Sequence, residues 1–281
     1  NLLPDDANIR RTVAERTGAA GTDPYSLLGA IGRDCVGALQ FLPEGAQPPD
    51  VARIESRPVN DAQIAEIVAN LAHNPLGLGR DPEFRISLAG AQEKTALLYL
   101  DKQWHLPHGT PPTTHILKPR LGVLPNGIDM SHSVENEHFC MILASGLGLP
   151  VAKTRILDFA GRRVLAVERF DRLWTKDKRL LRIPQEDMCQ ALSVPPSRKY
   201  QSDGGPNIRQ VLDLLKGSDA PEADRRTFLK AQLVFWLIGA TDGHAKNFSV
   251  RLSPGGRFRL TPLYDIVSVQ PAFDARRIQK K

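Results

Sequence analysis

Residues 239–250, GATDGHAKNFSV, hold four hydrogen-bonding or charged side chains within six positions: Asp242, His244, Lys246 and Asn247. The stretch follows residues 228–237, which are apolar enough to form a buried helix, and it precedes a predicted strand. Polar groups next to a buried helix are costly unless they have partners or a function. This loop is therefore the strongest candidate for a chemical site.

The spacing of acid and amide side chains indicates phosphoryl transfer. Asp242 and Asn247 are five residues apart, as are the Asp and Asn of the protein-kinase catalytic loop, H-R-D-x-x-x-x-N. There the Asp accepts the proton of the substrate hydroxyl and the Asn holds Mg²⁺. Asp265 follows at the end of a predicted hairpin, where a kinase places its second metal-binding carboxylate. The alternative is an ordinary Asp-Gly turn at the surface.

A second candidate is ISLAGAQEKTALLYL, residues 86–100. It is not a Walker-type P-loop, because Glu93 instead of Gly precedes Lys94 and Leu88 instead of Gly lies six residues before that lysine. Apolar residues on both sides of the small-residue segment predict a strand, a loop and a second strand. The loop of such a hairpin can offer main-chain N–H groups to phosphates. An ordinary surface hairpin with a charged tip is the alternative.

Two further segments could contact a nucleotide. PTTHILKP places Lys118 on a predicted strand, where a buried lysine needs an anion, and either Glu135 or Glu137 on the next predicted helix could pair with it. RVLAVERFDR ends in residues 168–170, between the strand-rich and helix-rich parts, where a hinge could offer backbone groups and an aromatic ring to adenine. The alternatives are a lysine at a strand end and an ordinary buried strand.

Composition limits the class of protein. The 281 residues are 41% hydrophobic and 24% charged, which is typical of a globular chain large enough for two lobes. The net charge of +6 suits an anionic ligand such as a nucleotide. Three cysteines without metal-type spacing predict reduced thiols in a cytoplasmic protein, and no membrane-spanning stretch or signal peptide is visible. Because the chain begins at Asn1 and ends on a basic, unpatterned stretch, we expect further residues at both ends.

The elements that position these residues form an α+β fold. Strands dominate from residue 85 to 170 and helices follow from residue 185, which predicts an N-terminal lobe over 1–170 with the phosphate loop and Lys118, and a C-terminal lobe over 171–281 with the catalytic loop and Asp265. Other predicted elements are a helix over 133–148, a hairpin turning at 253–256 and a strand through 264–266.

Together these segments resemble the HipA family of serine/threonine kinases, the toxins of bacterial toxin–antitoxin modules. The resemblance is carried by AGAQEKTALL, PTTHILKP, LAVERFDR, RIPQEDMCQALSVPPSRKY, SDGGPNI, LIGATDGHAKNFSV and LTPLYDI, and it extends to NLLPDD, IGRDCVGA and PLGLGRDPEFRIS. It implies a protein-kinase-like bilobal fold with a strand-rich N-terminal lobe and a helical C-terminal lobe.

The resemblance also implies roles for single residues. Asp242 would be the catalytic base, Asn247 and Asp265 would hold Mg²⁺, and Ser87 would be the site of an inactivating autophosphorylation. A phosphoserine there adds roughly −1.5 to −2 charge next to a loop meant for the phosphates of ATP. The implied ATP-binding residues are Ala89, Gly90, Ala91, Gln92, Glu93, Lys94, Lys118, Glu168, Arg169, Phe170, His244, Ala245, Lys246, Asn247, Tyr264 and Asp265.

The implied activity is ATP- and Mg²⁺-dependent phosphorylation of a protein serine, with glutamyl-tRNA synthetase as the substrate, so that translation stops and persister cells form. The implied partner is a HipB-type DNA-binding antitoxin, which would connect the chain to operator DNA; no membrane is involved. A small-molecule phosphotransferase of the antibiotic-kinase type is one alternative, although such enzymes place His before Gly-Asp and here Asp242 precedes His244. A non-catalytic nucleotide-binding or corepressor module is another, but it would not need Asp242.

Overall fold

The computed structural model describes residues 2–47, 50, 53–78, 84–90, 92–124 and 127–274. The chain forms two compact units, of which unit 1 comprises Asn1–Pro119 and Leu157–Pro184, and unit 2 comprises Arg120–Ile156 and Gln185–Lys281. The sequence predicted a single boundary near residue 170, whereas the observed units are discontinuous. The reason is that strand β8 (Arg162–Glu168) returns to pair with β4 (His115–Pro119) in the sheet of unit 1.

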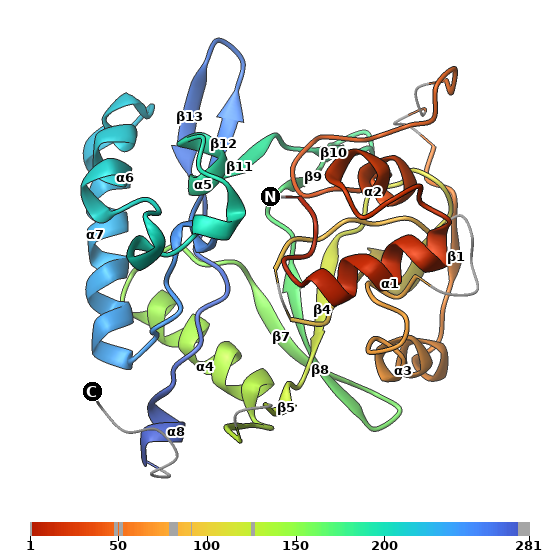
Figure 1. The fold of residues 1–281 in the computed structure, drawn as a ribbon, viewed down its shortest axis with the longest axis horizontal. Coiled ribbons are helices and arrows are strands. Elements are labelled where there is room, and N and C mark those ends of the chain that lie inside the picture. The colour runs from red at the N-terminus through yellow and green to blue at the C-terminus, as the bar shows by residue number, and fades with distance from the viewer. Residues whose placement is uncertain are drawn as a thin grey trace. The chain divides into compact units, whose positions relative to one another are not determined.

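A six-stranded sheet is the centre of unit 1 (Figure 1). Its strand order is β1-β3-β2-β4-β8-β7, and the strands not yet given are β1 (Ser56–Pro58), β2 (Thr95–Leu100), β3 (Gln103–Pro107) and β7 (Thr154–Phe159). Strands β2 and β3 form an antiparallel hairpin through Asp101 and Lys102, which both have left-handed φ angles of 48° and 65°. Two such residues are typical of the hairpin turn that matches strand twist.

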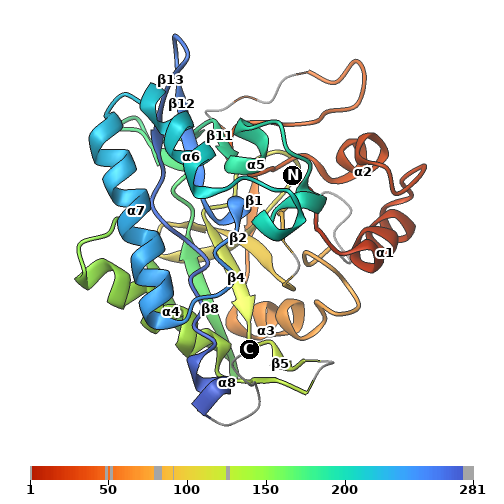
Figure 2. The same cartoon turned by 60° about the vertical axis from the view of Figure 1, so that its left-hand side comes forward.

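Three helices of unit 1 begin at capping side chains. They are α1 (Ala7–Thr17), α2 (Pro24–Ile31) and α3 (Asp61–Ala69), and their first turns are capped by Asp6, Asp23 and Asn60. Helices α1 and α2 pack against one another (Figures 1 and 2). Buried side chains from these helices, including Leu27, Ile31 and Ile64, join Leu97 and Leu117 of the sheet in one hydrophobic core.

The segment before the phosphate loop differs from its prediction. Residues 84–88 were expected to form the first strand of the hairpin, but they make only isolated bridges, including Ile86 to Asp34 and Phe84 to Gly109. Ile86, Leu88 and even Ser87 are almost completely buried. Because both sides of the segment face the protein interior, its alternating pattern does not mark a solvent-exposed face.

Five charged residues form a buried network in unit 1. Asp34 contacts Arg169 Nη1 at 3.2 Å, Arg172 Nη2 at 2.8 Å and Arg182 Nε at 3.1 Å. Asp171 accepts from Arg169 at 2.8 Å and from Arg172 at 2.9 Å. The β9 and β10 ribbon (Arg172–Trp174 and Leu180–Arg182) supplies two of these arginines. The network therefore ties the loop after α2 to the chain that follows β8.

Unit 2 is mostly helical, and its described residues form two small sheets. Its longer helices are α4 (Ser133–Gly146), α6 (Ile208–Leu214) and α7 (Pro221–Ile238); its shorter elements are α5 (Met188–Ala191), α8 (Gln270–Asp274), β5 (Gly122–Val123), β6 (Asp129–Met130), β11 (Gln185–Asp187), β12 (Ser249–Ser253) and β13 (Arg257–Leu260). The two sheets are β11-β12-β13 and β5-β6. The predicted hairpin is β12–β13, with Gly255 and Gly256 in its turn (Figure 1). None of the helices in the described ranges is long and apolar enough to cross a membrane.

The predicted strand through residues 264–266 is wrong. Only Leu263 makes an isolated bridge, to Val151, and the chain around Asp265 forms no ladder. Asp265 instead takes a left-handed φ of 59°, which interrupts the extended conformation. The residue thus lies in a turn beyond the hairpin and not in its second strand.

Asp34→Asn should destabilise the protein by roughly 3–5 kcal/mol in urea unfolding at pH 7, because it leaves buried arginines without their carboxylate. The exposed pair Asp177–Arg179 offers the control Asp177→Asn, for which little change is expected. Equal stability of the two variants would contradict the role given to the network.

The same carboxylate should make stability depend on acidity. Burial alone would raise the pKa of Asp34, but Arg172, Arg169 and Arg182 hold that pKa well below its usual range. As pH falls below about 4, Asp34 therefore becomes protonated in the unfolded chain but stays ionised in the folded protein. Stability declines as a result. Acid titration of unfolding should show a shallower decline in Asp34→Asn than in the parent protein.

Candidate active site

The loop that carries Asp242 begins where α7 ends. Gly239 closes the helix in the left-handed conformation, with φ of 66°, and its N–H donates back to the last helical turn. A side chain at Gly243 would collide with Phe235, because its Cβ would lie 2.6 Å from the ring. These two glycines allow a tight turn that leaves Asp242 exposed and begins the short 3₁₀ turn Ala245–Asn247.

Asn247 connects the two acidic residues. Its side chain is buried, and Nδ2 donates to the main-chain carbonyl of Asp242 at 3.0 Å and to that of Asp265 at a longer 3.4 Å. An amide nitrogen carries two donors, so both are directed at these carbonyls and the amide oxygen remains an acceptor. The three residues singled out from the sequence therefore meet at one place within unit 2.

Tyr264 holds the same two segments together from the other side. Its hydroxyl donates to the carbonyl of Lys246 at 2.8 Å and lies 2.6 Å from Ser249 Oγ. The left-handed conformation of Asp265, the next residue, costs of order 1 kcal/mol for a residue other than glycine. Such a conformation persists only where its surroundings impose it, and here the contacts of Tyr264 and Asn247 do so. Binding of ATP by Tyr264 stays a prediction.

His244 and its neighbours form the inner wall of the loop. The imidazole Nδ1 of His244 is buried without a hydrogen-bond partner in the described part of the chain. Burial, reinforced by the charge of Lys199, lowers the pKa of His244. Ala245 and Lys246 are buried, and the Ala245 N–H donates to the carbonyl of Lys199 at 3.2 Å. The imidazole of His244 is thus neutral near pH 7.

A residue that the sequence analysis did not single out completes this group. Tyr200 Oη donates to Asp242 Oδ1 at 2.7 Å, and its ring meets the His244 ring edge-on at 5.0 Å. Tyr200 stands in the segment SVPPSRKY, which sequence analysis quoted only for its resemblance. Nothing in the spacing of these residues predicts the contact, because 42 positions separate the partners.

In unit 1, a lysine at one end of the predicted phosphate loop is hydrogen-bonded to the residue at the other end. Lys94 is buried, and its Nζ donates to the carbonyl of Ala89 at 2.6 Å. Gly90 has a φ of 101°, and a Cβ there would lie 2.6 Å from the same Nζ. The left-handed φ therefore favours glycine at this position, whereas the lysine end could shift to make room.

The other predicted residues of this region lie nearby in unit 1. Gln92 Nε2 donates to the carbonyl of Pro119 at 3.1 Å, which ties the loop to the end of β4 beside Lys118. Lys118 is itself buried on β4, while Glu93 is exposed. Ala91 lies outside the described residues. The pairing of Lys118 with Glu135 or Glu137 stays a prediction, since both glutamates belong to α4 of unit 2.

Ser87 is completely buried. Its hydroxyl donates to the carbonyl of Leu2 at 2.9 Å and its N–H to the carbonyl of Asp34 at 2.9 Å. A phosphate group cannot be added to the hydroxyl in this conformation. Phosphorylation of Ser87 therefore requires residues 84–90 to move away from these contacts.

The predicted hinge, in which residues 168–170 offer backbone groups and an aromatic ring to adenine, stays a prediction. The Arg169 guanidinium is buried in the network with Asp34 and Asp171, and the main-chain N–H of Arg169 donates to the carbonyl of Thr114 at 2.9 Å. Its side chain is therefore structural. Glu168 is exposed at the end of β8 and Phe170 is partly buried, so their contact with ATP stays a prediction.

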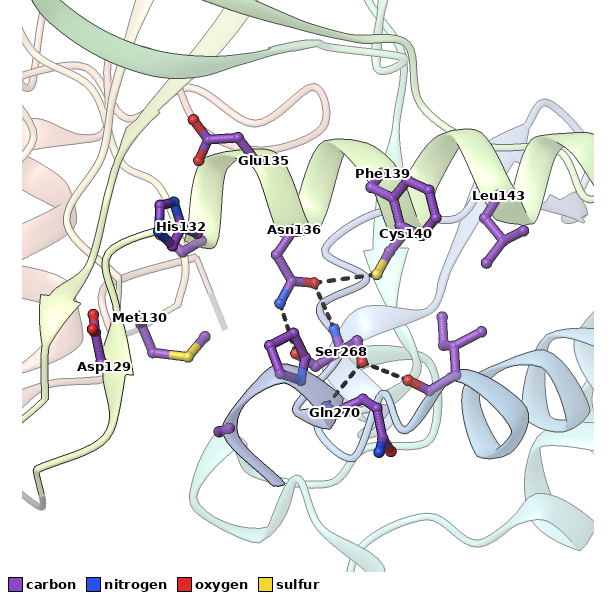
Figure 3. Close-up of a pocket in the computed structure, with 14 residues that line it drawn as sticks. Asp129, Met130, His132, Glu135, Asn136, Phe139, Cys140, Leu143, Ser268 and Gln270 are labelled. Atoms are coloured by element: carbon purple, nitrogen blue, oxygen red, sulfur yellow. Dashed lines mark hydrogen bonds between the residues drawn. The ribbon is translucent and has the colours of Figure 1, made fainter. Parts of the chain in front are cut away.

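A pocket of about 650 Å³ in unit 2 lies elsewhere, between α4 and residues 268–272 (Figure 3). Asn136 projects into this region, but its amide is already bonded to the backbone of Ser268, at 2.7 and 3.0 Å. Phe139 and Leu143 make much of the remaining wall apolar. None of the residues predicted to bind ATP or metal lines the pocket, so it is distinct from the group around Asn247.

The donor set around Asn247 suits Mg²⁺ better than zinc. In the described ranges, no three His, Cys, Asp or Glu side chains are grouped to hold a metal ion. Magnesium prefers oxygen ligands and commonly takes only one or two carboxylates besides phosphate oxygens. The carboxylate of Asp265 and the amide oxygen of Asn247 fit that requirement.

Comparisons with known proteins identify the family of the chain. A model described as HipA-like C-terminal domain matches residues 86–280, and a model described as HipA N-terminal domain matches residues 1–42. The first of these covers the phosphate loop, the predicted hinge and the catalytic loop. The chain belongs to the HipA family.

Individual HipA relatives match nearly the whole chain. Y4mE of Sinorhizobium fredii, which is named as a kinase, is 38% identical over 95% of this chain and 62% of its own length. The serine/threonine-protein kinase toxin HipA of Shewanella oneidensis is 33% identical over 96% of this chain and 62% of its own length. The chain thus spans less than two thirds of these curated relatives.

A solved structure gives the same fold. The chain matches the Shewanella oneidensis complex of HipA, HipB and operator DNA with a TM-score of 0.78 and 31% identity, over 96% of this chain and 63% of the other. The predicted α+β, protein-kinase-like fold is therefore confirmed.

Asn247→Asp should weaken the site's structure, because it replaces a donor by a carboxylate oxygen facing two carbonyls. The expected loss is roughly 1–3 kcal/mol of unfolding free energy in urea. Asn207→Asp is the control, since Asn207 only caps α6 and Asp caps equally well. If both variants unfold at the same urea concentration, Asn247 is not the connection described.

His244 should titrate below its usual pKa of about 6.5 when followed by NMR. Lys199→Gln should move the midpoint upward, because removal of a nearby positive charge makes protonation easier. A midpoint at or above the usual value in the parent protein would show that the imidazole is not buried as described.

Proposed function

We propose that this chain is the catalytic core of an ATP- and Mg²⁺-dependent protein serine/threonine kinase of the toxin type. The observation that carries the proposal is the amide of Asn247, which joins the backbone of Asp242 to that of Asp265. The order acid, amide, acid is that of the catalytic Asp, the metal-binding Asn and the later metal-binding Asp of protein kinases. Kinase names among the HipA relatives support the same activity.

Asp242 acts as the base. Its exposed carboxylate accepts the proton of a substrate hydroxyl and orients that oxygen towards the γ-phosphate. Asn247 and Asp265 hold Mg²⁺, which neutralises the charge of the phosphates when it is bound. Lys118 and the main chain of residues 89–94 bind the phosphates of ATP. Most of the acceleration comes from positioning and charge neutralisation.

Glutamyl-tRNA synthetase is the proposed protein substrate, with arrest of translation and persistence as the consequence. A DNA-binding antitoxin of the HipB type is the proposed partner, and operator DNA is reached through it in the cytoplasm. Support comes from the Shewanella oneidensis assembly, in which HipA occurs together with HipB and operator DNA.

Ser87 is the proposed site of autophosphorylation. Its burial means that the modified form cannot retain the contacts to Leu2 and Asp34. The added phosphate, of roughly −1.5 to −2 charge, then disfavours return of the segment to its place beside residues 89–94. Autophosphorylation would therefore inactivate the kinase by preventing ATP from binding.

Incubation with γ-labelled ATP, Mg²⁺ and purified glutamyl-tRNA synthetase should label the synthetase and Ser87. Asp242→Asn should reduce both signals by roughly a hundredfold to ten-thousandfold, because the base is lost. Asp213→Asn, an exposed substitution on α6, is the matched control and should leave them unchanged. Mass spectrometry of the labelled peptides identifies the modified serines.

Three outcomes would contradict parts of the proposal. Full labelling by Asp242→Asn would remove Asp242 as the base. Transfer to aminoglycosides or sugars instead of protein would make the chain a small-molecule phosphotransferase. ATP binding without any transfer would leave a nucleotide-binding module.

A further inference from the structure

The contact between Tyr200 and Asp242 is the closest side-chain interaction that the structure gives to the proposed base. The distance of 2.7 Å from Oη to Oδ1 is typical of a strong O–H···O bond. An ionised carboxylate has no proton to give, so the phenol is the donor. One carboxylate oxygen is thereby held, while the other oxygen keeps its capacity to accept.

The loop that carries Tyr200 is built to hold it in place. The carbonyl of Tyr200 accepts two main-chain N–H groups, from Asp203 at 3.1 Å and from Gly205 at 2.9 Å. A Cβ at Gly205 would lie 2.0 Å from the carbonyl oxygen of Arg198 and 2.7 Å from that of Tyr200. No other residue fits there without opening the loop, so Gly205 keeps the loop closed on itself.

The same loop is bonded to the catalytic loop at a second point. The Ala245 N–H donates to the carbonyl of Lys199, the residue before Tyr200. The Tyr200 ring also packs edge-on against His244, and Lys199 Nζ lies 5.3 Å from the ring centre. Backbone, ring and hydroxyl contacts therefore fix Tyr200 relative to Asp242.

We infer that Tyr200 is a positioning residue that holds the Asp242 carboxylate in one orientation, with its second oxygen directed to the acceptor hydroxyl. This inference rests on the proposed function of Asp242 as the base. An exposed aspartate without such a donor would sample several rotamers, and only a fraction of them would face the acceptor. The tight backbone of the loop favours a fixed support over a gate that swings away.

Tyr200→Phe in the full chain tests the inference, because it removes only the hydroxyl and keeps the ring against His244. We expect kcat to fall roughly tenfold to a hundredfold, the value of one hydrogen bond to a charged group. KM for ATP should stay unchanged. Tyr25→Phe, at a side chain that is 89% exposed, is the control.

The pH profile separates positioning from a loss of structure. Loss of a hydrogen bond to the ionised form raises the pKa of a carboxyl group. The acid limb of the kcat profile should therefore move to higher pH in Tyr200→Phe and stay in place in Tyr25→Phe. Lys199, His244 and Asp265 are the other charged or titratable groups near Tyr200 and Asp242. Tyr200→Phe and Tyr25→Phe both retain these three groups.

A second variant keeps the test independent of Tyr200 itself. Gly205→Ala should open the loop and lower kcat in the same way, while leaving both partners chemically intact. If Tyr200→Phe retains the parental kcat and the parental pH profile of kcat, the inference is overturned. If the parent protein transfers no phosphate to any acceptor, the proposed function fails instead, which distinguishes the two failures.

Discussion

The candidate site depends on one buried amide. Asn247 uses both donors of its side chain on main-chain carbonyls that belong to separate segments, one after α7 and one after β13. Together with the Tyr264 hydroxyl, which donates to the carbonyl of Lys246, this amide joins the loop of Asp242 to the segment of Asp265. The amide also leaves its oxygen available, so a single side chain both builds the site and can serve as a ligand.

In unit 1, buried ion pairs connect distant segments in the way that the Asn247 amide does in unit 2. Asp34 and Asp171 form ion pairs with three arginines, Arg169, Arg172 and Arg182. These pairs are buried enough that removal of one partner would leave a buried charge. The Arg169 guanidinium is therefore committed to structural ion pairs. Both units thus use buried polar contacts between distant segments to hold the residues on which the proposed chemistry relies.

Local patterns predicted several of the elements and the grouping of Asp242, Asn247 and Asp265. The hairpin β12–β13 follows from its Gly-Gly turn, and Asp242 and Asn247 are close because only a short loop separates α7 from β12. Features that depend on distant partners could not be predicted. Arg169 meets Asp34 across 135 positions, and Ser87 meets Leu2 across 85, so the sequence around each residue did not indicate its burial.

The central claim is that Asn247 and Asp265 hold a metal ion on ATP beside Asp242. A crystal structure of the chain with Mg²⁺ and a non-hydrolysable ATP analogue tests it most directly. The account predicts metal density bonded to the amide oxygen of Asn247 and a carboxylate oxygen of Asp265, with the γ-phosphate facing Asp242. Nucleotide and metal bound away from these three residues would contradict it.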